Sequence, residues 1–256
     1  MEFIVVTGAS SGIGEAICYE LAKKKNNLII VARNRQLLIK LKQKLESYYL
    51  IDVMIMPYDL SEKTNLIKMH QDCQKFNVVG LVNNAGIGLY GNFNELTLED
   101  EMNLINLNLI SVHFLSKLFL KDFINQGSGR LLNVASTAAF QAGPLMASYY
   151  ASKAYVLNLT EGIAEEIKDS YPNITISVLC PGPVETNFQK RASITMTNQY
   201  ALSANKVAQY AVREWLKGKV LIIPGRSNRM LIFLNRFIPR KIGRQMIKKN
   251  QLKKQK

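Results

Sequence analysis

A tyrosine and a lysine four positions apart are the first residues in this sequence whose types and spacing could do chemistry. Tyr149 and Lys153 stand at the two ends of the run YYASK, where a stretch of helical period begins. Residues four apart lie on one face of a helix, so both side chains can reach one cleft. A nearby ammonium favours the phenolate form of tyrosine and thus lowers its pKa. The spacing therefore predicts a proton donor and acceptor, and the alternative is an ordinary amphipathic helix.

A glycine-rich turn could bind phosphate. The segment TGASSGIG, residues 7–14, follows an apolar strand and leads into a stretch of helical period. Glycines let the backbone approach a pyrophosphate, and the free N–H groups and positive end of the next helix stabilise its charge. The spacing is G-x-x-x-G-x-G and not the G-x-G-x-x-G of the general dinucleotide fingerprint. The turn predicts a phosphate cradle, with a plain strand-to-helix turn as the alternative.

The elements that must position these residues alternate along the chain. Strand-length runs of Val, Ile and Leu without polar alternation are followed by stretches of helical period, as in a doubly wound three-layer α/β/α fold. We expect a seven-stranded parallel sheet in one domain, residues 1–225, and a basic C-terminal extension, residues 226–256. Residues 183–203 resist assignment and are expected to form a loop or lid over the site. The expected strands are residues 3–6, 28–32, 53–57, 78–83, 130–135, 175–180 and 220–223, and the expected helices 14–25, 36–47, 66–76, 98–125, 148–169 and 204–217.

Composition narrows the class of protein. With 48% apolar and 20% charged residues, the chain fits one globular domain, and no apolar run approaches the roughly 20 residues that cross a bilayer. Because the first strand begins at residue 3, we expect no signal peptide and a cytoplasmic location. The cysteines Cys18, Cys73 and Cys180 are expected to be reduced and structural. Two histidines and no His, Cys or carboxylate cluster give no support to a metal site or a histidine-based hydrolase.

Five motifs occur in order after successive predicted strands. They are the glycine-rich loop, Asn83-Asn84-Ala85-Gly86, Ser136, the Tyr149 and Lys153 pair, and PGPVET at residues 181–186. In this combination the chain resembles the classical short-chain dehydrogenase/reductase family over about residues 3–225. The resemblance implies a Rossmann-type fold and an oxidoreductase that interconverts a carbonyl and an alcohol by hydride transfer. An aspartate common in the family a few residues before N-N-A-G is absent, which puts only local sheet-edge contacts in doubt.

The resemblance also implies a role for each motif residue. Tyr149 would be the general acid or base, Lys153 would lower its pKa and hold the nicotinamide ribose, and Ser136 would hydrogen-bond the substrate oxygen. Asn108 would support a water-linked proton relay to the lysine, and Asn106 is the rival assignment. The implied cofactor contacts are Gly8, Gly12, Ile13 and Gly14 at the pyrophosphate, Asp59 and Leu60 at the adenine, Asn83, Ala85 and Gly86 beside the adenosine ribose, Pro181, Gly182 and Thr186 at the carboxamide, and in addition Ser10, Ser11, Asn84 and Val184.

The end of the second predicted strand addresses the choice between NADP(H) and NAD(H). NAD enzymes place a carboxylate there on the ribose 2′-OH, whereas an arginine accommodates a 2′-phosphate. Here the residue is Arg33, with no carboxylate nearby in the sequence. A charge-assisted hydrogen bond of about 1.5–3 kcal/mol predicts roughly 10- to 150-fold preference for NADPH. The alternative is that Arg33 opens the next helix as a solvated charge.

The substrate is specified only in part. Apolar residues beside the motifs suggest a largely apolar carbonyl or alcohol and do not choose among sugars, acyl chains, steroids or small ketones. The family resemblance suggests a homodimer or homotetramer that uses the helices at 98–125 and 148–169. The candidate pocket residues are Tyr90, Phe93, Phe140, Leu145, Met146, Phe188 and Tyr200, and each could equally serve packing.

The net charge of +14 is concentrated at the C-terminus. Nine lysines and arginines and no carboxylate follow residue 235, after an apolar run at residues 230–238. The folded body is therefore not expected to bind nucleic acid. We expect this tail to form a helix that covers the mouth of the site or packs on a partner subunit, and contact with an anionic membrane is the alternative. The rival functions are a non-catalytic dinucleotide sensor and a membrane-associated lipid or acyl carbonyl reductase that uses the tail.

Overall fold

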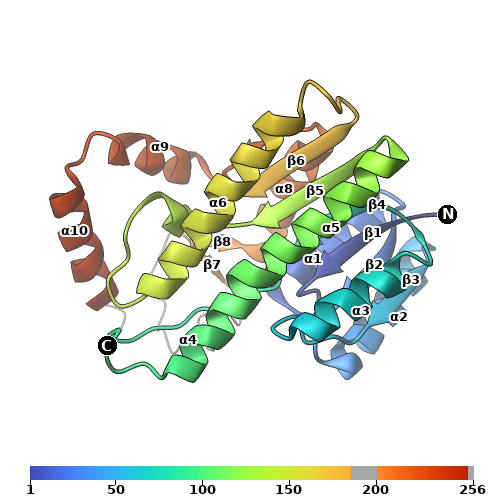
Figure 1. The fold of residues 1–256 in the computed structure, drawn as a ribbon, viewed down its shortest axis with the longest axis horizontal. Helices are drawn as coiled ribbons and strands as arrows, with labels where there is room; N and C mark the ends of the chain where they lie inside the picture. The colour runs from blue at the N-terminus through green and yellow to red at the C-terminus, as the bar shows by residue number, and fades with distance from the viewer. Residues whose placement is uncertain (186–200, 253–256) are drawn as a thin grey trace.

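Seven parallel strands form the centre of the molecule, in the order β3-β2-β1-β4-β5-β6-β9 (Figure 1). The structure is a computed structural model, and it describes residues 1–185 and 201–252. The predicted seven-stranded parallel sheet is confirmed, and its strand order reverses direction between β1 and β4. In open α/β sheets ligands bind at such a reversal point. The strands are β1 (Glu2–Thr7), β2 (Asn27–Val31), β3 (Val53–Met56), β4 (Asn77–Asn83), β5 (Gly129–Val134), β6 (Ile174–Leu179) and β9 (Leu221–Ile222).

Helices cover both faces of this sheet and make the three-layer Rossmann-type fold. Successive strand residues enter opposite layers, so Val5 and Val6 are both fully buried but belong to different core clusters. This explains why the strands lack polar alternation. The first layer contains α1 (Gly12–Lys23), α2 (Arg35–Tyr49) and α8 (Ala204–Leu216), and the second contains α3 (Lys63–Cys73), α4 (Leu98–Ile105), α5 (Ser111–Gln126) and α6 (Ala147–Ile167).

One long helical run crosses the second layer. The predicted helix at 98–125 is continuous from α4 to α5, but residues Asn106–Ile110 between them form one turn of π-helix. The run Leu98–Gln126 is long and apolar enough to span a membrane by length and composition alone, and 44% of its most apolar window is buried. Leu115, Phe119 and Phe123 pack in the core below it. The apolar side chains of this run are therefore accounted for, at least in part, by burial against the sheet.

A buried amide network joins the sheet to this layer. Asn83 Nδ2 donates to Asn133 Oδ1 at 2.9 Å, and Asn133 Nδ2 donates to Thr160 Oγ1 at 3.0 Å. Ser116 Oγ on α5 donates to the same Asn133 oxygen at 3.2 Å. The expectation that Asn83 lies beside an adenosine ribose is wrong, because its side chain is held inside this network. The expectation that it stabilises the central sheet agrees with these contacts.

Two short elements and two helices complete the described chain. The segment at 183–203, expected to be a loop, begins and ends in a two-stranded parallel pair, β7 (Val184–Glu185) and β8 (Leu202–Ser203). Residues 226–252 fold as α9 (Arg226–Asn235) and α10 (Arg240–Leu252), the latter at the left margin of Figure 1. Asn235 Nδ2 donates to Phe140 O at 3.2 Å and ties α9 to the turn Thr137–Phe140. The C-terminal extension is thus attached beside Ser136.

The amide network predicts a stability defect. Asn133→Ala removes a partner from each of three buried polar side chains, and an unsatisfied buried group costs about 1–3 kcal/mol. We expect the free energy of unfolding, measured by urea denaturation, to fall by roughly 2–4 kcal/mol. The matched control is Asn158→Ala, since Asn158 is an exposed residue of α6 and its removal should cost less than about 0.5 kcal/mol. Equal losses in the two variants would contradict the assignment.

Candidate functional site

A cavity of about 630 Å³ opens at the carboxyl ends of the parallel strands. Its wall is made by the loops that follow β1, β2, β4, β5 and β6, so distant parts of the sequence meet there. Thr186 lies outside the described residues, and Gly14 and Asn108 stand behind the wall. The predicted site residues that line the cavity are Gly8, Ser10, Ser11, Gly12, Ile13, Arg33, Asp59, Leu60, Asn84, Ala85, Gly86, Ser136, Tyr149, Lys153, Pro181, Gly182 and Val184.

The glycine-rich loop has the geometry of a phosphate cradle. Gly8 and Gly12 have φ of +65° and +62°, in the left-handed region that favours glycine. Ser11 precedes α1 without a side-chain capping bond, so the first N–H groups of α1 remain free for an anion at the cavity. Gly14 serves packing instead of lining the cavity, because a Cβ there would lie 2.3 Å from Gly8 O.

Hydrogen bonds lock this loop to the segment after β4. Thr7 Oγ1 accepts from the backbone N–H groups of Asn84 and Ala85 at 2.9 and 3.0 Å. In return Asn84 Nδ2 donates to Thr7 O at 3.0 Å and to Gly8 O at 3.2 Å. A Cβ on Gly8 would lie 2.8 Å from Ala85 Cα, so the two loops are also in tight contact. Asn84 therefore sets the shape of the cradle in addition to lining it.

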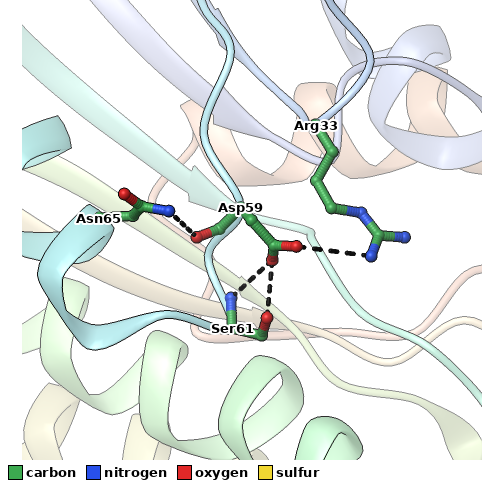
Figure 2. A network of polar contacts seen from close by, with 4 residues as sticks. All are labelled: Arg33, Asp59, Ser61 and Asn65. Carbon is green, nitrogen blue, oxygen red and sulfur yellow. Dashed lines mark hydrogen bonds and ion pairs between the residues drawn. The ribbon is translucent and has the colours of Figure 1, made fainter.

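Arg33 does not stand alone at the end of β2. Its Nη1 lies 3.6 Å from Asp59 Oδ2, and Figure 2 shows Asp59 also accepting from Ser61 N and Oγ at 3.0 and 2.7 Å. Partial burial acts to raise the pKa of Asp59, but the bonds from Ser61 and the Arg33 guanidinium hold that pKa below its ordinary value. The carboxylate that the local sequence lacked is thus supplied by the β3–α3 loop. Arg33 is oriented along the cavity wall, although its side chain stays 57% exposed.

Tyr149 and Lys153 meet in the cavity wall as their spacing predicts. Lys153 Nζ lies 5.9 Å from the centre of the Tyr149 ring and donates to Val134 O at 2.9 Å. Only 5% of Lys153 is exposed, and burial lowers its pKa to about 8. Burial raises the pKa of Tyr149 to about 12, although a hydrogen bond with Ser136 acts in the opposite direction. Without a bound nucleotide, the phenol is therefore firmly protonated.

Ser136 is fixed at the end of β5. It precedes the turn Thr137–Phe140, and its Oγ accepts from Ala138 N at 3.1 Å as a cap. The same oxygen donates to Pro181 O at 3.4 Å, which joins the loops after β5 and β6. These contacts hold Ser136 next to Tyr149, so a hydroxyl donor and a phenol face one region of the cavity.

Asn108 occupies the π-helical turn between α4 and α5. Its Nδ2 donates to Ile87 O at 2.8 Å and its Oδ1 accepts from Ile87 N at 2.9 Å. A Cβ on Gly86 would touch both Asn108 Oδ1, at 3.1 Å, and Lys153 Nζ, at 3.5 Å, which places the amide beside the lysine. The extra residue per turn of a π-helix turns Asn108 inward, as often happens at functional sites. The geometry favours Asn108 over Asn106.

Most of the candidate pocket residues are not found in the wall of the cavity. Of the seven, only Met146 lines the cavity within the described part of the chain, and Phe188 and Tyr200 lie outside that part. Phe93 points mostly to solvent, and Phe140 packs against the core cluster beside β6. Sequence proximity to a motif does not determine on which side of a loop a side chain lies.

Tyr150 and Gln251 are among the cavity residues that the sequence analysis did not predict. Tyr150 lines the cavity beside Tyr149, and Gln251 reaches it from the last turn of α10. Gln251 is 2% exposed, its Nε2 donates to Tyr150 Oη at 2.9 Å, and its backbone O accepts from Tyr90 Oη at 2.9 Å. The C-terminal segment does form a helix that reaches the cavity wall, through Gln251, while packing on a partner subunit stays a prediction. The position of Tyr150 next to Tyr149 was the only feature of the sequence that could have indicated its place in the cavity. Nothing in the sequence indicated Gln251.

Fold and site together define a class of protein, the nucleotide-dependent oxidoreductases of the Rossmann type. A parallel sheet, a glycine-rich loop at its reversal point and a buried Tyr-Lys pair share one cavity. Residues 2–197 match the family described as short chain dehydrogenase, and the chain belongs to this family.

Relatives and solved structures agree with this assignment. The chain is 29% identical over 221 residues to the ketoacyl reductase HetN of Nostoc, covering 84% of this chain and 75% of that one. It is 33% identical over 187 residues to human dehydrogenase/reductase SDR family member 7, which covers 71% of this chain and just over half, 55%, of that relative. A short-chain dehydrogenase from Sphingobium yanoikuyae in complex with NADPH superposes with a TM-score of 0.84 at 27% identity, over 88% of this chain and 89% of that one.

The lowered pKa of Lys153 predicts a pH-dependent stability cost. In the unfolded chain this pKa returns to about 10.5, so between about pH 8 and 10.5 the unfolded chain binds more protons than the folded protein. The lysine therefore costs stability at neutral pH, and the cost disappears as the pH rises through this range. We expect the difference in free energy of unfolding, wild type minus Lys153→Met, to increase from pH 7 to pH 10.5. Urea denaturation of the nucleotide-free proteins measures it, and a flat difference would contradict the shift.

Proposed function

We propose that the protein is an NADP(H)-dependent oxidoreductase that interconverts a carbonyl and an alcohol, with Tyr149 as general acid and base. The coarser statement, an oxidoreductase of the short-chain dehydrogenase family, is already established by the match over residues 2–197. The observation that carries the finer proposal is the convergence of Tyr149, Lys153 and Ser136 on one wall of the cavity that holds the glycine-rich loop. A non-catalytic sensor would have no use for this arrangement.

The cavity residues fit a dinucleotide. The free N–H groups at the start of α1 suit a pyrophosphate, and Lys153, which lines the same cavity, would hold the nicotinamide ribose. The bound nicotinamide ring would supply or accept the hydride. The cavity of about 630 Å³ is of the size that ligand sites usually have.

In the reductive direction the chain supplies the proton. Tyr149 Oη donates it to the substrate oxygen, and the Ser136 hydroxyl donates a hydrogen bond to that same oxygen as negative charge develops. Lys153, with its pKa of about 8, is mostly protonated at neutral pH, and its positive charge favours the phenolate that remains. Each unit by which the tyrosine pKa falls from about 12 needs about 1.4 kcal/mol of such stabilisation. Asn108 positions the loop beside Lys153 and leaves the lysine aimed at the cavity.

Two features support NADP(H) over NAD(H). Arg33 lines the cavity at the end of β2, where a 2′-phosphate would lie, and it pairs with Asp59, which Ser61 holds by two hydrogen bonds. A structural relative at 27% identity was solved with NADPH and another, from Thermococcus sibiricus, also at 27%, with 5-hydroxy-NADP. Asp59 competes for the guanidinium, so we expect a preference toward the lower end of the range given above.

Several residues outside the cradle give the cavity an apolar lining. They are Ile87, Leu107, Ala138 and Met146, and the polar side chains Gln141 and Gln251 line the same cavity. We therefore propose a largely apolar ketone, aldehyde or alcohol as the substrate class. A homo-oligomer is also part of the proposal, because Leu98, Met102 and Ile110 expose apolar side chains along the α4–α5 run.

Tyr149→Phe tests the mechanism. The variant keeps the ring but removes the proton donor, so we expect kcat for reduction of an aromatic ketone panel with NADPH to fall about 10²- to 10⁴-fold. Binding of NADPH, measured by fluorescence titration, should stay within about twofold since no cradle contact changes. Tyr155→Phe is the matched control, because Tyr155 lies on the same helix and its hydroxyl contacts His113 on the surface. A fully active Tyr149→Phe protein would exclude the proposed role.

Arg33→Ala tests the nucleotide. We expect NADPH to bind about tenfold more tightly than NADH in the wild type, and the variant to lose this preference by weakening NADPH alone. Raising the salt concentration should weaken NADPH more than NADH, because Arg33 is largely exposed and its charge is screened. Arg35→Ala is the control, an exposed arginine two positions on that does not line the cavity. Equal affinities for both nucleotides in the wild type would disprove the preference.

A further inference from the structure

The outer side of the two C-terminal helices carries an unusual number of exposed apolar side chains. Leu231 is 64% exposed and Phe237 is 72% exposed. Contiguous exposed apolar groups on a soluble domain mark a surface that something covers. We call this set, together with the basic residues described next, the C-terminal face. Its apolar members are Met230, Leu231, Phe233, Leu234, Phe237, Ile242, Met246 and Leu252.

Positive charge surrounds these apolar groups. The described part of α9 and α10, residues 226–252, contains eight arginines and lysines and no aspartate or glutamate. None of the eight makes an ion pair among the described residues, whereas several carboxylates of the body pair with neighbouring lysines or arginines, as Glu20 does with Lys23 and Asp72 with Lys75. The charged members of the face are Arg226, Arg229, Arg236, Lys241, Lys248 and Lys249, while Arg240 and Arg244 lie on the other side of α10.

The two helices attach to the body through their other side. Ile232 packs against the core cluster beside β6, and Asn235 bonds to Phe140 O. In α10 the less exposed positions Gly243, Ile247 and Gln251 recur every four residues and so share one helical stripe. This stripe ends at the Gln251 contacts with the cavity wall. The C-terminal face is therefore the side left over once these contacts are made.

We propose that the C-terminal face binds an anionic membrane surface. Apolar side chains flanked by lysine and arginine match the two requirements of that surface, which are a hydrocarbon region and negative headgroups. A second copy of the chain fits less well, because a two-fold contact would bring the unpaired cations of one face against those of another. A nucleic acid would neutralise the charge but leave the apolar groups uncovered.

Sedimentation with vesicles tests this proposal without any need for turnover. The full chain is mixed with vesicles of phosphatidylcholine alone or of phosphatidylcholine with phosphatidylglycerol, and the bound fraction is measured by centrifugation. We expect binding only to the vesicles with phosphatidylglycerol, and weaker binding at high salt. Each basic residue near such a surface contributes about fivefold, so Lys248→Glu with Lys249→Glu should lower the partition coefficient by about 25-fold or more. Phe237→Glu should lower it roughly tenfold or more.

Matched variants on the body separate a specific face from general basicity. Lys40→Glu with Lys117→Glu makes the same change in net charge at exposed positions of α2 and α5, and Tyr48→Glu replaces a side chain that is 75% exposed. These controls should bind vesicles nearly as the wild type does. Thermal melting and NADPH titration of every variant verify the fold and the nucleotide site, so a failure of the proposed enzymatic function is seen separately.

Three results would overturn the proposal. The first is no binding, or equal binding to neutral and anionic vesicles. The second is an equal loss of binding in the control variants, which would mean that net charge alone attracts the protein. The third is light scattering in which Phe237→Glu reduces the oligomer size without changing vesicle binding, since the face would then be an interface between copies of the chain.

Discussion

The site depends on keeping an ammonium group where almost no water reaches it. Lys153 is buried against Val134 O, and the same environment surrounds Tyr149. Burial favours the neutral form of both groups, which raises the pKa of the phenol to about 12 and lowers that of the amine to about 8. The chain alone therefore holds the proton on the tyrosine. The hydrogen bond with Ser136 acts in the opposite direction, and in the proposed mechanism the bound nucleotide and substrate would supply the further charge and hydrogen bonds that favour release of the proton.

Everything that positions this pair follows from the parallel sheet. Because the carboxyl ends of the strands meet at one edge, the loops after β1, β4, β5 and β6 must pack against each other, and polar groups in them need partners. Thr7 and Asn84 satisfy one junction, and Ser136 with Pro181 O satisfies another. At a third junction, Asn108 of the π-helical turn accepts a hydrogen bond from Ile87 N, next to Gly86. The loops of the cavity wall thus hold one another at fixed separations. Such fixed separations are needed if a proton donor and a phosphate cradle are to act in one cavity.

The sequence was sufficient for whatever depends on local pattern. Buried strands, the glycine-rich turn and the four-residue spacing of Tyr149 and Lys153 follow from periodicity and backbone freedom, and they were predicted correctly. Contacts between distant loops were not. Asp59 beside Arg33, Gln251 on Tyr150 and the enclosure of Asn83 in the amide network each join residues far apart in the chain. The pattern of a single sequence does not indicate which distant residues meet. The charge environment of Arg33 and most of the candidate pocket could therefore not be predicted.

The C-terminal helices have two differently used sides. The stripe of α10 that ends at Gln251 makes a polar contact with the cavity wall, while the opposite side carries uncompensated charge and apolar groups. A helix that served only to contact the cavity wall could present charged residues of both signs to water on its other side. Instead the segment lacks any carboxylate, at the expense of self-repulsion among its eight cations. That repulsion would be relieved by negative charge against the outer side, so an anionic surface bound to the C-terminal face would also stabilise the helix whose Gln251 contacts the cavity wall.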